Sequence, residues 1–206
     1  MNSLEKISYA LGMSMANNFR SSGIKELDVT KFGEGLDAAF NGKELAMTYD
    51  QAKETIREYF MAMEQEMQQQ AAAAAKVNEE AGKAHLEANG KRPEVVTLPS
   101  GLQYEVIEEG NGPQPTAQDQ VKVHYTGRLI DGTVFDSSVE RGEPATFGVT
   151  QVIPGWVEAL QLMKVGSKWR LHIPSQLAYG PQGAGGVIGP NSTLIFDVEL
   201  LEVIGK

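Results

Sequence analysis

The residues of this chain that could do chemistry lie mostly in its second half, and few of them are acids, bases or nucleophiles. Aromatic and β-branched side chains instead recur in four segments: VKVHYTGRLIDGTVFD at 121–136, VIPGW at 152–156, LAYG at 177–180 and NSTLIFDVELL at 191–201. These segments predict a pocket lined by rings and branched aliphatic groups. Such a pocket suits binding, or a reaction that needs a dry, shaped environment and no proton transfer. Rotation about a peptidyl-prolyl bond is a reaction of that kind.

Taken together and in order, the four segments resemble the FKBP-type peptidyl-prolyl cis–trans isomerases. The resemblance extends over residues 97–204 and rests on several separated blocks, which makes it more specific than a single short motif. The helical part that precedes it resembles the macrophage infectivity potentiator (Mip-like) branch, the dimeric bacterial members of the family. The resemblance implies an enzyme that isomerises X–Pro bonds in folding proteins without a cofactor, and that FK506- and rapamycin-type macrolides inhibit.

The resemblance also implies roles for individual residues. Trp156 matches the floor beneath the proline ring, and the hydroxyl of Tyr179 matches a donor to a substrate carbonyl. Asp136 matches the one pocket carboxylate, held by Tyr125 and Arg141. We assign catalysis to Tyr125, Phe135, Asp136, Tyr179 and Phe196. We assign substrate binding to Arg141, Phe147, Val152, Ile153 with its backbone N–H, Trp156, and the flap residues Val187 and Ile188.

The chain departs from the family pattern at the rim of the predicted pocket. Ala145 stands where many members carry an aromatic or other bulky residue, and Ala184 stands where some carry a histidine. Gly189 stands where proline is common. These smaller residues predict a reduced and more mobile rim and flap, and they leave the sequence preference and the affinity for macrolides open.

Each aromatic residue taken alone would equally fit an ordinary hydrophobic core, so the prediction rests on the joint occurrence of the segments. Two other motifs carry little weight. The glycine-rich stretch at 183–189 resembles a phosphate-binding loop, but it lacks a following Lys-Ser/Thr and a helix, and it runs into Pro190. Asp136, Ser137 and Ser138 resemble a nucleophile beside a carboxylate, but nothing in the sequence places a histidine beside them as a base.

The composition excludes several classes of function. Eighteen basic against 27 acidic residues give a net charge of −9, which argues against a nucleic-acid groove. Cysteine is absent, so disulfides and thiolate chemistry are excluded. The three histidines are scattered without ligand spacing, so no metal is predicted.

The sequence also bears on the compartment. No apolar run approaches the ~20 residues that a transmembrane helix needs. Residues 1–20 have helically spaced apolar positions interrupted by serine, glycine and asparagine, and so lack the continuous apolar region of a signal peptide. We therefore predict a cytoplasmic protein. The periplasm or the outer surface is the alternative, if a signal peptide has been removed.

Helical periodicity dominates the first half of the chain. Apolar residues recur at three- and four-residue steps from Leu4 to Phe19 and predict a first helix. A second helix is predicted over 31–40 with Gly42 after its end, and a third over 50–89, stopped by Gly90. Capping residues are predicted at Asn2 with Glu5, at Asp28 or Thr30, and at Thr48 with Gln51.

The third predicted helix would be a rod about 60 Å long. Its second half is rich in alanine, glutamine, glutamate and lysine and lacks a strong apolar face, so we expect it to run through solvent as a spacer. Gly82 would cost about 1 kcal/mol relative to alanine and mark a soft spot. A flexible linker is the alternative. The predicted division is a helical dimerisation module at 1–48, a connecting helix at 49–90 and a catalytic domain at 91–206.

The N-terminal helices carry more apolar surface than so small a unit can bury, which predicts a homodimer formed through them. Seven of the eight methionines lie at or before Met67, where they could fill that interface or contact clients. Three functions are therefore open: a prolyl isomerase, a holdase chaperone whose helical module binds unfolded proteins, and a proline-binding module with an idle pocket. The first two are compatible.

From Pro93 onward the period changes from helical to two, as in strands with one buried face. Apolar and polar residues alternate over 102–106, 121–125, 169–173 and 194–200. Asp131–Gly132 predicts a two-residue hairpin turn, and 156–163 predicts a short helix closed by Gly166. The predicted fold class is α+β: an all-α N-terminal module, a long spacer helix, and an antiparallel half-barrel sheet wrapped on a short helix, as the resemblance also implies.

Overall fold

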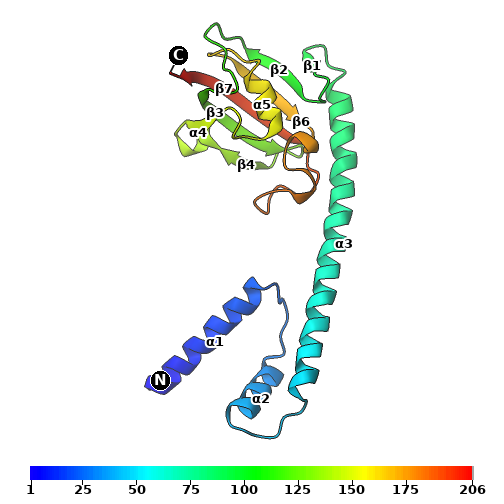
Figure 1. Cartoon of the computed structure of the whole chain (residues 1–206), viewed down its shortest axis with the longest axis vertical. Helices are drawn as coiled ribbons and strands as arrows, with labels where there is room; N and C mark the ends of the chain where they lie inside the picture. The colour runs from blue at the N-terminus through cyan, green and yellow to red at the C-terminus, as the bar shows by residue number, and fades with distance from the viewer. Residues whose placement is uncertain (206) are drawn as a thin grey trace. The chain divides into compact units, whose positions relative to one another are not determined.

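The computed structural model describes residues 1–205 and contains two compact units (Figure 1). The first unit comprises Met1–Ala62, and the second begins at Met63. The first holds α1 (Ser3–Ser21), α2 (Val29–Phe40) and the first turns of α3 (Tyr49–Asn89). The rest of α3 belongs to the second unit with the sheet. Among residues 1–205, no helix combines the length and the apolarity needed to cross a bilayer.

Side-chain caps fix the starts of these helices, as predicted. Asn2 and Glu5 form a reciprocal capping box at α1. The carboxylate of Asp28 accepts two backbone N–H groups at the start of α2, which therefore begins at Val29, two residues before the predicted start. The reciprocal bonds of Thr48 and Gln51 open α3.

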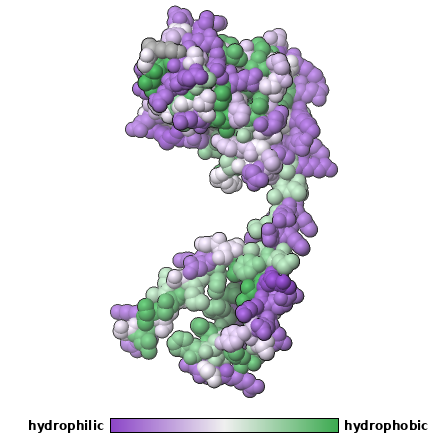
Figure 2. Space-filling model, viewed as in Figure 1, coloured by the Kyte–Doolittle hydropathy of each residue, from purple (hydrophilic) through white to green (hydrophobic). Residues whose placement is uncertain are grey.

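The N-terminal unit has no buried core within one chain. No side chain of residues 1–62 is buried, and the apolar Leu4 and Phe40 are 74% and 85% exposed. Phe19 of α1 and Phe32 of α2 meet edge to face, with ring centroids 5.4 Å apart. Figure 2 shows hydrophobic residues gathered on the surface of these helices. A single copy of this unit therefore leaves in water the faces that the sequence predicts to be buried.

The second unit is built on an antiparallel sheet with the strand order β1-β2-β6-β7-β3-β4, and β5 also pairs with β3. The strands are β1 (Val95–Thr97), β2 (Gln103–Glu108), β3 (Gln120–Leu129), β4 (Val134–Ser137), β5 (Ala145–Gly148), β6 (Lys168–Ile173) and β7 (Leu194–Ile204). The short helices are α4 (Ser138–Arg141), α5 (Pro154–Leu160), η1 (Ser175–Leu177) and η2 (Gly180–Gln182).

The alternating pattern of the strands puts one face of the sheet into a single core against α5. Val121, Val123 and Tyr125 of β3 are buried, and the apolar residues of β6 and β7 meet them. Pro154, whose fixed φ suits the first turn of a helix, begins α5. The predicted helix over 156–163 is thus shifted: it ends at Leu160, although Met163 is still fully buried.

The hairpin between β3 and β4 is present where predicted, but its turn is longer than two residues. The Leu129 N–H donates to the Thr133 carbonyl, and the Gly132 N–H donates to the Leu129 carbonyl. The loop therefore runs from Ile130 to Gly132. Gly132 has a φ of 92°, a conformation typical of the glycine that ends a three-residue hairpin loop.

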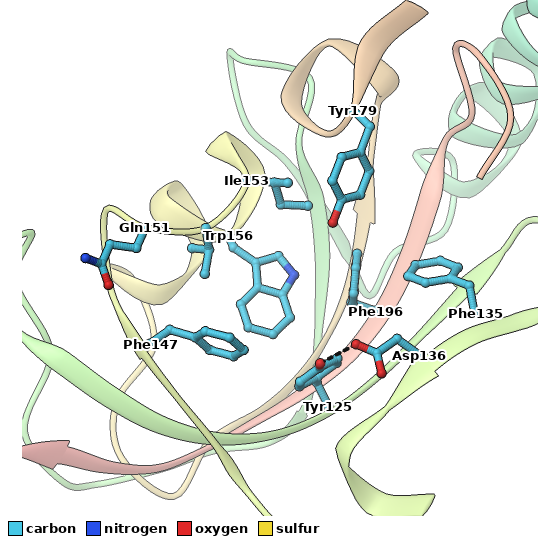
Figure 3. A pocket seen from close by; sticks show the side chains of 10 residues that line it. Tyr125, Phe135, Asp136, Phe147, Gln151, Ile153, Trp156, Tyr179 and Phe196 are labelled. Carbon is cyan, nitrogen blue, oxygen red and sulfur yellow. Dashed lines mark hydrogen bonds between the residues drawn. The ribbon is translucent and has the colours of Figure 1, made fainter. Parts of the chain in front are cut away.

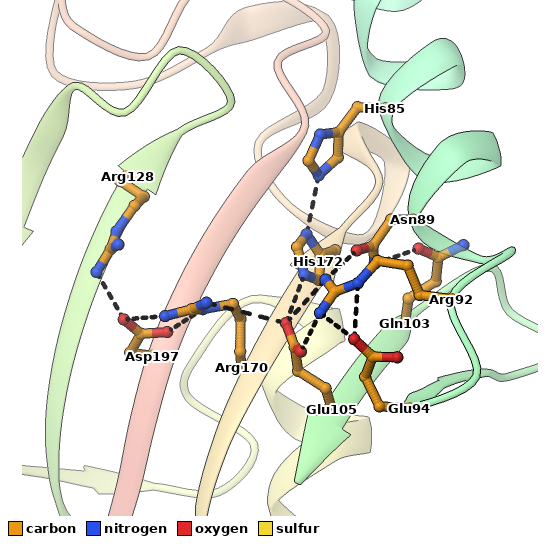
Figure 4. A network of polar contacts seen from close by, with 10 residues as sticks. All are labelled: His85, Asn89, Arg92, Glu94, Gln103, Glu105, Arg128, Arg170, His172 and Asp197. Atoms are coloured by element: carbon orange, nitrogen blue, oxygen red, sulfur yellow. Dashed lines mark hydrogen bonds and ion pairs between the residues drawn. The ribbon is translucent and has the colours of Figure 1, made fainter. Parts of the chain in front are cut away.

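The last turns of α3 are not a solvated spacer, and that prediction was wrong for them. Asn78, Gly82, His85 and Asn89 follow helical spacing and face the sheet. Asn78 donates to the Pro190 carbonyl (2.8 Å). His85 Nε2 lies 2.9 Å from His172 Nδ1, and Asn89 donates to Gln103 (2.9 Å) (Figure 4). Polar contacts hold this face, which is why a search for an apolar stripe misses it.

The docked helix buries polar residues of the strand beneath it. Gln103 and Glu105 of β2 are both buried, although their alternation with apolar residues is typical of a solvated face. Gln103 donates to the carbonyl of Leu86, and Glu105 forms an ion pair with Arg92 at 2.8 Å. Each buried polar group thus has a partner, as burial requires.

Candidate active site

A cavity of about 460 Å³ opens between α5 and the sheet (Figure 3). Its walls are mostly aromatic. The residues that line it are Tyr125, Phe135, Asp136, Phe147, Gln151, Val152, Ile153, Trp156, Tyr179 and Phe196.

Different elements deliver these side chains to one place. Tyr125 comes from β3, Phe135 from β4, Phe147 from β5 and Phe196 from β7. A glycine makes room where two of the rings meet. A Cβ on Gly127 would lie 2.6 Å from the rings of both Phe135 and Phe196, so any larger residue would push them apart.

Trp156 of α5 forms the floor of the cavity. It is 3% exposed, and its ring meets those of Tyr125, Phe147 and Phe196 edge to face, with centroids 5.3, 5.9 and 5.2 Å apart. Within residues 1–205 its buried Nε1 has no hydrogen-bond partner, and Figure 3 shows that nitrogen on the side of the indole toward Phe196. The edge-to-face geometry fits the charge distribution of aromatic rings and fixes the floor rigidly.

One charged group lies in the wall. The Tyr125 hydroxyl donates to the Asp136 carboxylate, and Arg141 donates to the same carboxylate and, at 3.0 Å, to the Tyr125 oxygen. Burial raises the pKa of Tyr125 above its ordinary value, and the hydrogen bond to Asp136 raises it further. Burial alone would raise the pKa of Asp136, but the bonds from Tyr125 and Arg141 outweigh it, so the pKa lies below its ordinary value. At neutral pH the pair is therefore a phenol and a carboxylate.

Two donors on the cavity wall point to no protein acceptor. Within residues 1–205 the hydroxyl of Tyr179 makes no hydrogen bond, its side chain is 40% exposed, and Figure 3 shows it directed into the cavity. The backbone N–H of Ile153, just before α5, likewise donates to no acceptor in that part of the chain. Both groups are free to bind the carbonyl oxygens of a peptide.

The structure brings most of the predicted site residues into this cavity, with three exceptions. Arg141 donates to the Asp136 carboxylate but does not line the cavity. Val187 is 50% exposed and Ile188 is buried in the core, and neither lines it; an antiparallel bridge between Ala184 and Ile188 closes their loop. Gln151 lines the cavity and was missed, although it directly precedes Val152 in the segment that carries the match.

A histidine does lie beside the serines that follow Asp136, contrary to the expectation from the sequence. His124 Nδ1 is 3.0 Å from Ser138 Oγ, because β3 and the start of α4 are neighbours. Ser138 is fully buried, however, and its oxygen accepts the backbone N–H of Tyr125 at 2.8 Å. A serine without access to substrate is not a nucleophile, so burial, and not the lack of a neighbouring histidine, excludes that chemistry.

Known proteins are similar to this chain in sequence and in fold. Residues 112–201 match the family described as FKBP-type peptidyl-prolyl cis-trans isomerase, and residues 4–106 match the domain amino terminal to FKBP-type peptidyl-prolyl isomerase. The peptidyl-prolyl cis-trans isomerase Mip of Coxiella burnetii is 48% identical over 202 residues, which cover 98% of this chain and 87% of that protein.

Two further relatives span nearly the whole chain. The outer membrane protein MIP of Legionella longbeachae is 44% identical over 199 residues, or 97% of this chain and 85% of that protein. The crystal structure of FkpA from Escherichia coli has a TM-score of 0.73 and 40% identity, covering 98% of this chain and 97% of that one. The predicted family, the fold class and the enzymatic reaction are thereby confirmed. The chain belongs to the FKBP-type peptidyl-prolyl cis–trans isomerases, in the branch of Mip and FkpA, and rotates X–Pro bonds.

Proposed function

We propose that the chain accelerates X–Pro rotation in folding proteins, without a covalent intermediate, inside the cavity above Trp156. The observation that carries this proposal is an apolar aromatic floor beside two unpaired donors, the Tyr179 hydroxyl and the Ile153 N–H. A planar amide is a charge-separated resonance form, and the twisted amide is less polar. A dry cavity therefore disfavours the planar form relative to the twisted one.

Each group has a role in this mechanism. The proline ring packs on the indole of Trp156. The Tyr179 hydroxyl and the Ile153 N–H donate hydrogen bonds to substrate carbonyls and so fix the twisted geometry. Asp136 stays ionised because Arg141 and Tyr125 hold its proton affinity low. Its charge near the amide oxygen raises the energy of the planar form, in which that oxygen is most negative. Phe135 and Phe196 exclude water from the reacting bond.

The size of the required effect is modest. An unaided X–Pro bond rotates in tens to hundreds of seconds over a barrier of roughly 18–20 kcal/mol. Shortening ~100 s to ~1 ms requires about 7 kcal/mol of transition-state stabilisation. Desolvation, shape and a few hydrogen bonds can supply this without proton transfer.

We further propose that the N-terminal unit is completed by a second copy in an isologous homodimer. No side chain of residues 1–62 is buried in one chain, and a groove of about 640 Å³ lined largely by apolar atoms runs along α2 and the segment before α3. Two copies pairing their faces would remove this surface from water. Two pockets on one assembly would then raise the effective concentration of a bound unfolded protein.

A chaperone with secondary catalysis is the second candidate, favoured by the methionine-rich N-terminal unit. An idle proline-binding module does not fit the enzymatic reaction that the family match shows. Refolding of a client whose folding needs no prolyl isomerisation separates the first two functions. If the full chain aids that refolding, the helical unit binds clients independently of catalysis.

The compartment stays a prediction. The cytoplasm is our first expectation, and the periplasm or outer surface is the alternative; the Legionella longbeachae relative is called an outer membrane protein. Fractionation of cells that express the complete gene would decide between them.

The decisive test of the whole proposal has two parts. A protease-coupled assay on an X–Pro peptide should show acceleration that FK506- or rapamycin-type macrolides abolish. Sedimentation should give twice the mass of one chain at micromolar concentration. A rate equal to that in buffer would contradict the proposed catalysis, and a monomer would contradict the dimer.

A further inference from the structure

Ser138 fills a gap in the sheet beside Tyr125, whose side chain lines the cavity. β5 pairs with β3 only as far as Val123, and β4 pairs with β3 only from Thr126 onward. On that side, within residues 1–205, the backbone of Tyr125 has no strand neighbour. The Ser138 hydroxyl takes that place: it accepts the Tyr125 N–H at 2.8 Å and lies 3.3 Å from the Tyr125 carbonyl.

The junction of β4 and α4, which we call the β4–α4 corner, also carries the partners of the Tyr125 hydroxyl. Asp136 is the last residue but one of β4, Ser137 ends that strand and caps α4 by accepting the Glu140 N–H at 3.2 Å, and the last residue of α4 is Arg141. Because Ser138 begins α4 and is bonded to β3, it ties this corner to the backbone of Tyr125. His124, at 3.0 Å, is its third partner.

We propose that Ser138 is a positioning residue for the isomerase reaction. Its hydroxyl holds the β4–α4 corner against β3, so that the Tyr125 phenol meets Asp136 and Arg141 in one fixed arrangement. This inference rests on the proposed role of Tyr125 and Asp136 in the cavity. Ser138 itself touches no substrate, because it is fully buried.

The test compares Ser138→Ala with a matched control, Ser167→Ala. Ser167 is also a buried serine whose oxygen accepts backbone N–H groups, those of Gly110 and Lys164, but it lies outside the cavity. We expect Ser138→Ala to lower kcat/KM at least fivefold, mainly through kcat, and Ser167→Ala to change it less than twofold. Ser138→Cys, whose slightly larger thiol is only a weak hydrogen-bonding group, serves as the second variant if the alanine variant fails to fold.

A double-mutant cycle with Tyr125→Phe distinguishes positioning from general loss of structure. We expect Ser138→Ala to have less than a twofold effect once the Tyr125 hydroxyl is gone. Wild-type kcat/KM in both Ser138 variants would overturn the proposal, as would an equal loss in the Tyr125→Phe background. Wild-type activity of Tyr125→Phe alone would instead overturn the assigned role of Tyr125, and the Ser138 proposal with it.

A second, independent feature lies where α3 meets the sheet (Figure 4). His85 of α3 and His172 of β6 face each other, with Nε2 and Nδ1 2.9 Å apart. On its other side, His172 Nε2 is 3.5 Å from Glu105 of β2. His172 is 3% exposed, and Glu105 is paired with Arg92 and, more weakly, with Arg170.

A hydrogen bond between two imidazoles needs one N–H and one lone pair. Protons added to both rings leave two donors and two like charges face to face. Burial lowers the pKa of His172 to about 4, against the opposing bond to Glu105, and the charges of His85 and Arg170 lower it further. Burial also lowers the pKa of His85. One added proton can be accommodated in an N–H⁺···N bond, but the closed contact excludes a second proton, which the separated rings would bind.

We propose that the His85–His172 pair is an acid-sensitive clasp that holds the last turns of α3 on the sheet. The charged groups that face it are Glu105, Arg92 and Arg170, with Glu94 and Asp197 bonded to those arginines. A separated histidine titrates near 6.5, so the open state binds more protons than the closed state as the pH falls from about 6.5 to 4. Titration of His172 therefore lowers the ratio of docked to released α3 by up to tenfold for each unit by which the pH falls within this range. Above pH 6.5 the ratio is constant.

The absence of cysteine allows a direct test in the full chain. Leu86→Cys places a thiol beside the clasp on the docked side of α3, and Lys83→Cys, in a separate variant, places one on the exposed side. The alkylation rate of the Leu86→Cys variant is divided by that of the Lys83→Cys variant, which cancels the intrinsic effect of pH on thiols. We expect this ratio to rise at least tenfold between pH 7.5 and 5.0.

The same ratio should not change with pH when His85→Gln and His172→Gln are combined, because glutamine does not titrate. His85→Gln alone, at the more exposed of the two positions, serves if the double variant is unstable. A constant ratio in the chain with both histidines would overturn the proposal. So would an equal rise in the glutamine variants, because another group would then control the docking.

Discussion

Gly82 of α3 lies so close to Thr193 that a Cβ on the glycine would be 2.3 Å from the threonine Oγ1. In an exposed helix, Gly82→Ala would stabilise the protein by about 1 kcal/mol. Here the methyl group must displace Thr193 or lift the helix, and overpacking costs about 1–3 kcal/mol. We therefore expect Gly82→Ala to lower the free energy of unfolding. Guanidinium titration followed by tryptophan fluorescence measures it, since Trp156 and Trp169 both lie in this unit.

Thr193→Ala provides the matching control, because it removes the nearest atom and leaves the threonine Cβ position, 3.1 Å away, as the closest neighbour. In that background Gly82→Ala should cost less than in the wild type. A stabilising Gly82→Ala in the wild-type chain would mean that this part of α3 does not rest on the sheet.

Because α3 docks on the sheet, a stable catalytic fragment must include the last turns of α3 and so must begin before the predicted domain boundary at residue 91. A fragment that starts at Arg92 lacks His85 and Asn89, and it exposes Gln103. These three polar contacts, at about 0.5–1.5 kcal/mol each, predict a loss of roughly 1.5–4.5 kcal/mol in unfolding free energy. A fragment that starts at Gln70 keeps these contacts and should unfold at a higher guanidinium concentration. Equal midpoints for the two fragments would contradict the prediction.

The elements that could be predicted from the sequence are those in which apolar residues recur at regular spacing. The strands around Tyr125 and Phe196 alternate strictly, and one of their faces is buried against α5. The cavity residues could be assigned because the family resemblance supplied contacts between distant segments. Gln151 was missed although it directly precedes the matched segment at 152–156, since its side chain is neither aromatic nor charged.

The docking face of α3 could not be predicted in this way, because polar groups form it. Asn78, His85 and Asn89 resemble a solvated helix face, and Gln103 resembles the outer face of a strand. Their partners lie far away in the sequence, so only the folded structure brings them together. The spacing of 78, 82, 85 and 89 was the available signal: a glycine among hydrogen-bonding residues on one helix face indicates close approach. The four-residue α4 is too short for any periodicity to predict.

Two substitutions test the proposed cavity. Tyr179→Phe removes one hydrogen-bond donor and should lower kcat/KM about 2–10-fold, the effect of a neutral hydrogen bond. Phe135→Ala opens the wall to water and should lower it at least as much. Trp156→Ala is less informative, because removing a buried tryptophan costs about 3–5 kcal/mol of stability. Peptide isomerisation measured at matched folded fractions gives these values.

Val139→Ala is the control for these variants, since Val139 is exposed on α4 and does not line the cavity. It should leave kcat/KM unchanged. Wild-type values for both Tyr179→Phe and Phe135→Ala in folded protein would show that the reaction takes place elsewhere.

The electrostatics of the cavity predict a reaction rate that does not depend on pH near neutrality. The pKa of Asp136 is lowered from 3.8, and that of Tyr125 is raised from 10.0, so neither group changes its charge between pH 5 and 9. We expect kcat/KM to vary less than about twofold over that range. Protease-free exchange spectroscopy on a peptide without ionisable side chains measures it, because a coupled protease has its own pH profile. Tyr179→Phe should lower the rate equally at every pH. A bell-shaped profile with a midpoint in this range would instead indicate proton transfer in the rate-limiting step, and the non-covalent mechanism without acid or base would have to be abandoned.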